Sequence, residues 1–118
     1  MAIISSHTLN SVDGTHAGGI DVTLFRFDPS GARSAIFKTK TDDGGRLSET
    51  IAVSEVEKAS RYELVFQTGA YFSAQRIPVA GMQIMPEIVI RFAIPDPDAR
   101  YHIPLMLAPN SYSVWWSS

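Results

Sequence analysis

The sequence predicts an all-β protein, a sandwich or a barrel, and two observations carry this prediction. Apolar and polar residues alternate along many short segments; in residues 20–27, for example, Ile20, Val22 and Leu24 share one face. Clusters of Gly, Pro, Asn and Asp separate these segments at short, regular intervals. A period of two indicates a strand with one buried face. Many short strands divided by such turns are typical of a sandwich or barrel.

The expected elements follow in order along the chain. The strands are expected at 3–9, 20–27, 34–41, 47–51, 61–68, 86–94 and 101–108, with 112–118 as a candidate last strand. Turn residues occupy 13–19, 28–32, 42–45, 95–98 and 109–111. One segment departs from the alternation: 69–76 is expected to form a short helix, and 77–85 an apolar loop.

Length and composition restrict the classes of protein that fit. The 118 residues suit a single domain spanning 1–118, and 45% hydrophobic residues suffice for one core. The chain has no cysteine, which excludes a disulfide framework, a thiolate nucleophile and a Cys-based metal site. The net charge of −2 and the scattered basic residues give no reason to expect nucleic acid or a membrane as partner. Without a signal peptide or a long apolar run, we expect a cytoplasmic protein.

Three histidines are the first candidates for chemistry: His7, His16 and His102. Their spacing matches no usual zinc motif, so no metal is expected. His102 stands between Tyr101 and Ile103, whose side chains should face the core, so its imidazole should point away from the core. Two interpretations stay open at this point. His102 lies on a solvated sheet face, or on a face that another subunit covers and that holds a catalytic imidazole.

Arg46 follows the turn "TDDGG" and begins a short strand. It is either a solvated turn cation or a guanidinium that holds a carbonyl-rich or anionic ligand by two parallel hydrogen bonds. Several serines are nucleophile candidates by type, among them Ser5 and Ser118, but none lies in a G-x-S-x-G turn. Water activated by histidine is at least as economical a nucleophile.

Four stretches together resemble the 5-hydroxyisourate hydrolases, the transthyretin-like proteins of urate breakdown. The start "SSHTLNSVDGTHAGGIDVTLFRF" looks like their opening, and "TKTDDGGRL" is similar to their Thr-Asn-x-x-Gly-Arg turn. The stretches "YELVFQTGAYF" and "PEIVIRFAIPDPDARYHIPLMLAPNSYS" match their strand-to-helix segment and their last strands. The resemblance runs from about residue 5 to residue 114.

The resemblance implies a transthyretin-like sandwich of two four-stranded sheets with one short helix. It also implies a homotetramer whose dimer–dimer interface forms a channel with the active sites. The first strand of that fold lies beside the seventh, so His7 and His102 should be neighbours that face the channel. The family's catalytic set maps onto His7, Arg46, His102 and the retained Ser118. Its reaction opens a ring amide of a small heterocyclic substrate by water, and we expect no cofactor.

The sequence departs from the family at the tail and in the first loop. The family usually ends in Tyr-Arg-Gly-Ser; here Trp115 and Trp116 replace the Tyr and the Arg. His16 stands where the family has Pro, and Asn10 where it has Asp. A tryptophan cannot replace the charge of the tail arginine; it offers a flat apolar wall and one N–H donor. We therefore expect Trp115 and Trp116 to belong to the substrate-binding surface.

Three functions remain open on these grounds. The first is hydrolysis of 5-hydroxyisourate in purine breakdown. The second is hydrolysis of a different, more aromatic lactam, lactone or imide, suited to a tryptophan-lined channel. The third is binding of a small molecule without catalysis, since the same fold carries aromatic hormones in transthyretin and a fold alone does not settle function.

Overall fold

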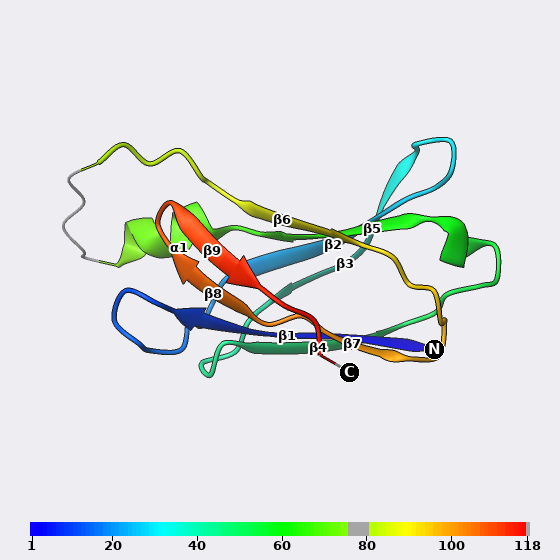
Figure 1. The fold of residues 1–118 in the computed structure, drawn as a ribbon, viewed down its shortest axis with the longest axis horizontal. Helices are drawn as coiled ribbons and strands as arrows, with labels where there is room; N and C mark the ends of the chain where they lie inside the picture. The colour runs from blue at the N-terminus through cyan, green and yellow to red at the C-terminus, as the bar shows by residue number, and fades with distance from the viewer. Residues whose placement is uncertain (76–80, 118) are drawn as a thin grey trace.

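The computed structural model describes residues 1–75 and 81–117, which form two β-sheets packed face to face with one α-helix at one end (Figure 1). The first sheet has the order β4-β1-β8-β9, with β7 also paired to β1, and the second has the order β3-β2-β5-β6. The strands are β1 (Ala2–Asn10), β2 (Asp21–Phe27), β3 (Arg33–Lys40), β4 (Arg46–Ile51), β5 (Arg61–Phe66), β6 (Ile88–Phe92), β7 (Arg100–His102), β8 (Leu105–Ala108) and β9 (Ser111–Val114). This confirms the predicted sandwich.

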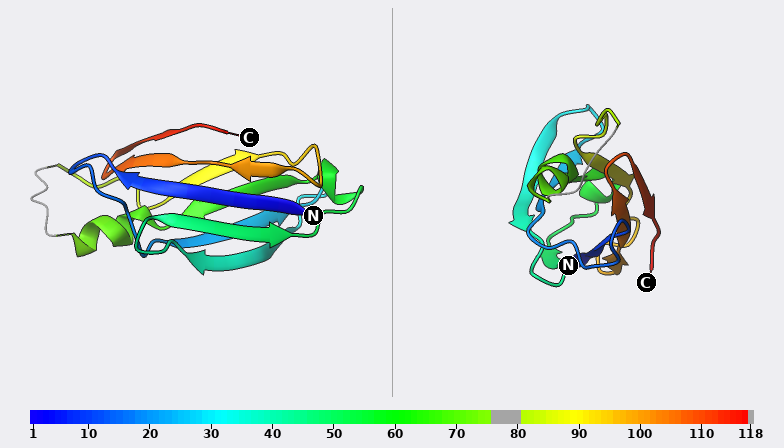
Figure 2. Two further views of the ribbon diagram at one scale, coloured as in Figure 1. Left: turned by 90° about the horizontal axis from the view of Figure 1, so that it is seen from below. Right: turned by 90° about the vertical axis from the view of Figure 1, so that its left-hand side faces the viewer.

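The first sheet shows five strands among the described residues where four were predicted, because one expected strand is interrupted. β7 and β8 together span the predicted 101–108 strand, and both run parallel to β1. Between them lies Pro104, which has no N–H to donate to a ladder. The two pieces therefore occupy the place of one strand, as Figure 2 shows from two further sides.

The same proline limits the last strand. β9 pairs with β8 only from Ser111 to Val114, so the candidate strand at 112–118 ends earlier than predicted. Trp115 N–H reaches the Pro104 carbonyl at 3.4 Å, and regular pairing stops there. It resumes as a single bridge between Ser117 and His102, with N–H···O distances of 2.9 and 3.2 Å. The tail thus returns to the edge of β7 beside His102.

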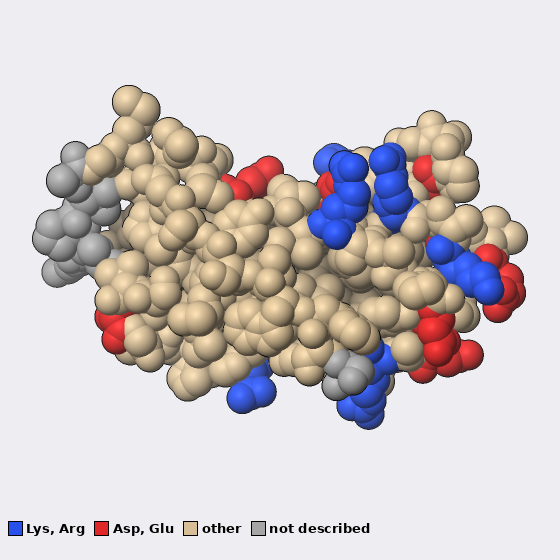
Figure 3. All heavy atoms as spheres, viewed as in Figure 1, with Lys and Arg blue, Asp and Glu red and all other residues tan. Residues whose placement is uncertain are grey.

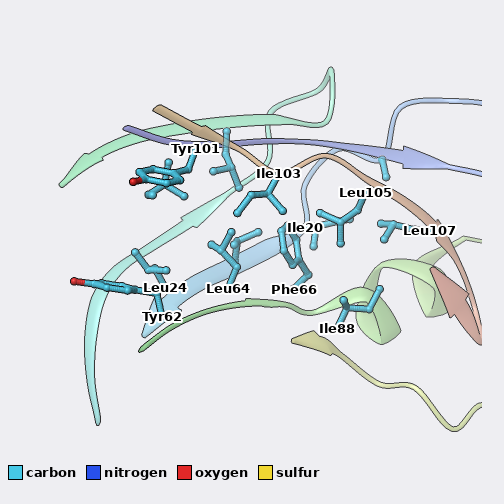
Figure 4. Close-up of a cluster of buried hydrophobic side chains, with 14 of the residues drawn as sticks. Ile20, Leu24, Tyr62, Leu64, Phe66, Ile88, Tyr101, Ile103, Leu105 and Leu107 are labelled. Atoms are coloured by element: carbon cyan, nitrogen blue, oxygen red, sulfur yellow. The ribbon is translucent and has the colours of Figure 1, made fainter. Parts of the chain in front are cut away.

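The core lies between the sheets and takes one face of each strand (Figure 4). Fully buried side chains come from both layers: Ile4, Ile20, Val22, Leu24, Tyr62, Leu64, Phe66, Ile94, Leu105 and Leu107. This face is the one that alternation predicted for residues 20–27 and 101–108. The other face of the first sheet is left free to carry functional groups.

β1 is central to the first sheet, and its inner face is partly polar. Ser6, Thr8 and Asn10 are buried, whereas Ser5 and His7 point to the outer face and are half-buried. The buried hydroxyls are satisfied within the chain; Ser6, for example, donates to the Ile103 carbonyl at 2.6 Å. Satisfied hydrogen bonds remove most of the cost of burying polar groups. β1 can therefore face the core with polar residues and still keep Ser5 and His7 outside.

The predicted helix is present as α1 (Thr68–Ala74), close to the expected range 69–76, whose last residue lies outside the described ones. Gly69 is required where α1 meets the chain before β6, because a Cβ there would lie 2.7 Å from the Pro86 carbonyl oxygen. A 3₁₀ turn spans Glu57–Ala59.

Among the described residues, no helix is both long enough and apolar enough to cross a membrane. The expected loop 77–85 is irregular over 81–85, and its first part lies outside the described residues.

Candidate active site

A polar groove of about 590 Å³ runs over the outer face of the first sheet, across β1, β4 and β7. Its lining is mostly hydrophilic and comes from these strands and the end of β3: Ile3, Ser5, Ser6, Thr39, Lys40, Asp42, Arg46, Leu47, Ser48, Glu49, Arg100 and His102. His7 lies on the same outer face, two residues beyond Ser5 along β1. Three of the predicted catalytic residues, His7, Arg46 and His102, thus gather on one face although they are far apart in sequence.

Arg46 is placed by the turn that precedes β4. The Asp42 carboxylate accepts hydrogen bonds from the backbone N–H groups of Gly44 and Arg46, both at 2.9 Å. Gly45 has φ +75°, and a Cβ there would lie 2.4 Å from the Thr8 carbonyl oxygen. Only glycine fits this close approach to β1. The turn therefore sets Arg46 directly opposite His7 in the β1–β4 register, with its guanidinium exposed.

The pKa of His7 lies below its ordinary value of 6.5. Burial is the largest cause, followed by the positive charges of Arg46 and His16, whereas the Gly44 carbonyl acts in the opposite direction. His7 is therefore neutral at neutral pH, which is the state that a general base needs.

His102 lies opposite Ser5 in the parallel β1–β7 register. Its Nδ1 is 2.8 Å from Ser5 Oγ, a contact that fixes the orientation of the half-buried imidazole. The predicted adjacency of the first and seventh strands is confirmed, and it brings His102 and His7 onto one face. The backbone of His102 also pairs with Ser117, so the tail lies next to this residue.

The two tryptophans line a second groove of about 470 Å³, between β6 and the end of β9. Trp115 and Trp116 are 46% and 62% exposed, and they share this groove with Ile90, Phe92 and other apolar residues. Within one chain this groove is distinct from the polar groove over β1, β4 and β7. A role of the tryptophans in substrate binding stays a prediction. Ser118 lies outside the described residues.

Two features of the site were not predicted from the sequence. Ser5 was considered only as a nucleophile, whereas in the structure its hydroxyl contacts His102. Arg100 was not singled out, although the period of two along β7 places it on the same face as His102 and it lines the groove. His16, whose position was left open, stacks on His7.

Within residues 1–75 and 81–117, no three His, Asp or Glu side chains are grouped so that they could hold a metal ion.

The arrangement offers the groups that hydrolysis of an amide requires. A neutral histidine can take a proton from water, a second histidine can supply one to a leaving nitrogen, and a guanidinium can stabilise a developing oxyanion.

Comparison with known proteins places the chain in a family. A family model described as the HIUase/Transthyretin family matches residues 4–116. The chain belongs to this family. The 5-hydroxyisourate hydrolase of Pseudomonas aeruginosa is 30% identical over 118 residues, covering 100% of this chain and 93% of that protein. The 5-hydroxyisourate hydrolase of Ralstonia nicotianae is also 30% identical, over the full length of both chains.

Solved structures agree with this assignment. The 5-hydroxyisourate hydrolase of Klebsiella pneumoniae superposes with a TM-score of 0.77 at 25% identity, covering 100% of both chains. An (S)-allantoin synthase superposes with a TM-score of 0.82 at 28% identity, covering 99% of this chain but 44% of that protein. Transthyretin from Sparus aurata, at 23% identity and a TM-score of 0.78 over 97% of this chain and 95% of that one, shares the fold.

Proposed function

We propose that this protein hydrolyses a cyclic amide, and that its substrate is 5-hydroxyisourate, an intermediate of urate breakdown. The observation that carries the proposal is the convergence of His7, Arg46 and His102 on one outer sheet face. Full-length relatives that carry the name 5-hydroxyisourate hydrolase support the choice of substrate.

The chemistry follows from the three side chains. A neutral histidine at the His7 end of this face acts as the base and removes a proton from water. The hydroxide then attacks the ring carbonyl carbon. Arg46 stabilises the oxyanion that forms, because its planar guanidinium can donate two parallel hydrogen bonds. His102, held by Ser5, delivers a proton to the ring nitrogen as the C–N bond breaks. No cofactor is needed for these steps.

The direct test is an ultraviolet assay of the purified protein with freshly generated 5-hydroxyisourate. We expect a decay much faster than the spontaneous one, and its loss in His102→Asn. Thr50→Val serves as a control, since Thr50 lies on β4 outside the groove. A decay no faster than the spontaneous rate would refute the proposal. Tight binding of a ligand that is recovered unchanged would instead favour a binding protein.

We further propose that the chain acts as a homotetramer with its active sites at the dimer–dimer interface. We also propose that it works in the cytoplasm, where disulfides are rare, because the chain has no cysteine. The uncharged end of the chain supports assembly: residues 101–118 contain no Asp, Glu, Lys or Arg. Figure 3 shows the surface over β8 and β9 free of charged atoms, with Lys and Arg gathered elsewhere. β9 is an edge strand whose residues are all exposed, which makes it able to pair with another chain.

Light scattering after gel filtration measures this assembly. We expect the mass of four chains for the wild type and a smaller mass for Val114→Lys, which places a charge on the β9 edge. A monomeric wild type with full activity would contradict the shared active site.

A second candidate keeps hydrolysis but changes the substrate to a more aromatic lactam, lactone or imide. The observation that favours it is the exposed pair Trp115 and Trp116, standing where the family has Tyr and Arg. Restoring the family tail by Trp115→Tyr, Trp116→Arg and Ser117→Gly should then raise turnover of 5-hydroxyisourate. High activity of the native protein that falls after this change would reject the second candidate.

A further inference from the structure

His16 is held against His7 by the loop that follows β1. The loop folds back over the strand: Asn10 N–H donates to the Thr15 carbonyl at 2.8 Å, and Ala17 N–H donates to the Thr8 carbonyl at 2.9 Å. The two imidazoles then stack with their centroids 4.9 Å apart and their planes 24° from parallel. His16 Nδ1 lies 2.9 Å from His7 Nε2, which is hydrogen-bond distance between two ring nitrogens.

A neutral imidazole has one N–H and one lone pair, so one of the two facing ring nitrogens donates and the other accepts. When His16 donates from its Nδ1 to His7 Nε2, His7 carries its own proton on Nδ1 and the lone pair of His16 lies on Nε2. His16 is the exposed partner of the pair, whereas His7 is half-buried. In this direction of the hydrogen bond, the free lone pair therefore lies on the ring that meets solvent.

This geometry changes which atom can act as the base. With His16 as the donor, the lone pair of His7 is occupied by the His16 N–H and is not free to bind water. The lone pair that meets solvent belongs to His16 Nε2, because the His16 side chain is exposed.

We propose that His16 donates from its Nδ1 to His7 Nε2, and that the two histidines form a proton relay in which His16 Nε2 is the atom that takes the proton from the hydrolytic water. The proposal rests on the hydrolytic function above and names a catalytic residue that stands where the family has Pro.

The first proton transfer balances within the pair. A water O–H bond breaks and its proton binds to His16 Nε2, while the Nδ1 proton of His16 passes to His7 Nε2. The hydroxide oxygen bonds to the ring carbonyl carbon. The positive charge now lies on His7, where the Gly44 carbonyl favours it and Arg46 and His102 oppose it. When the C–N bond breaks, the leaving nitrogen takes its proton from His102. The extra proton of the pair then passes through solvent to His102, so all three histidines return to their starting states.

Two substitutions separate a relay from a purely positioning role. His16→Phe keeps a ring to stack on His7 but has no nitrogen. His16→Gln keeps an N–H that can donate to His7 Nε2 but cannot pass a proton on. For a relay, kcat/KM falls in both variants by roughly a hundredfold, the lower range of what general acid–base catalysis supplies. Val12→Ala, an exposed change in the same loop, is the control and keeps wild-type activity.

The result that overturns the relay is His16→Gln with wild-type kcat/KM, because a donor alone would then suffice. Unchanged activity in both variants also overturns it. A second measurement does not need activity: ¹⁵N NMR of the imidazoles should show neutral His7 protonated at Nδ1, and a higher His7 pKa in His16→Phe because the positive charge of His16 is removed. Neutral His7 protonated at Nε2 would refute the relay even in a protein that proved inactive toward 5-hydroxyisourate.

Discussion

Replacing Ser5 by alanine should impair catalysis while leaving the fold intact. The hydroxyl of Ser5 touches His102 Nδ1 at 2.8 Å, and both residues lie half-buried on the outer face of the first sheet. Ser5→Ala removes only this hydroxyl. The strand keeps its backbone pairing with β4 and β7, and the core on the opposite face is unchanged.

The size of the effect follows from one hydrogen bond. Such a bond contributes about 0.5 to 1.5 kcal/mol net. If that energy orients His102 in the transition state, its loss lowers kcat/KM by about two- to tenfold, because about 1.4 kcal/mol corresponds to a factor of ten. The free energy of unfolding should change by less than about 1 kcal/mol, since water can reach the half-buried His102 nitrogen.

The assay is steady-state hydrolysis with urea denaturation in parallel, and Thr50→Val is the matched control. Thr50 is exposed on the same face of β4, so this variant also loses one hydroxyl but none that contacts His102. We expect a reduced kcat with little change in KM for Ser5→Ala only. Equal activities of Ser5→Ala and Thr50→Val would show that Ser5 does not position His102.

Three further outcomes are expected. Arg46→Lys keeps the charge but loses the planar fork, so kcat/KM should fall by roughly 10²- to 10³-fold with an unchanged urea midpoint; near-normal turnover would exclude the oxyanion role. The folded pKa of His7 lies below 6.5, so the unfolded chain binds more protons in the window under 6.5. Stability should therefore be full above this pH and decline as pH falls through the folded pKa, and His7→Gln should flatten the decline in urea titrations. Leu64→Ala, at a fully buried site between the sheets, should cost about 2 to 5 kcal/mol of unfolding free energy, and a cost near zero would contradict the assigned core.

The alternation of residues determined much of the fold. It predicted the strands, the buried faces of 20–27 and 101–108, and the outward direction of His102, because side chains along a strand point to opposite faces in turn. The resemblance to a family then predicted that the first and seventh strands are neighbours, which the β1–β7 pairing confirms. β1 shows the limit of the pattern, because its buried face carries Ser6 and Thr8 while Ile3 lies outside.

Only the tertiary structure decided which groups meet on the outer face. Ser5 and His102 are 97 positions apart and touch because β1 and β7 pair in one register. His16 reaches His7 because backbone hydrogen bonds fold the loop back over its own strand. A local pattern fixes the direction of a side chain but not its partner, since partners are set by strand register and loop closure over long sequence distances. The sequence alone thus determined the faces, and the pairing of strands and loops decided the contacts of the site.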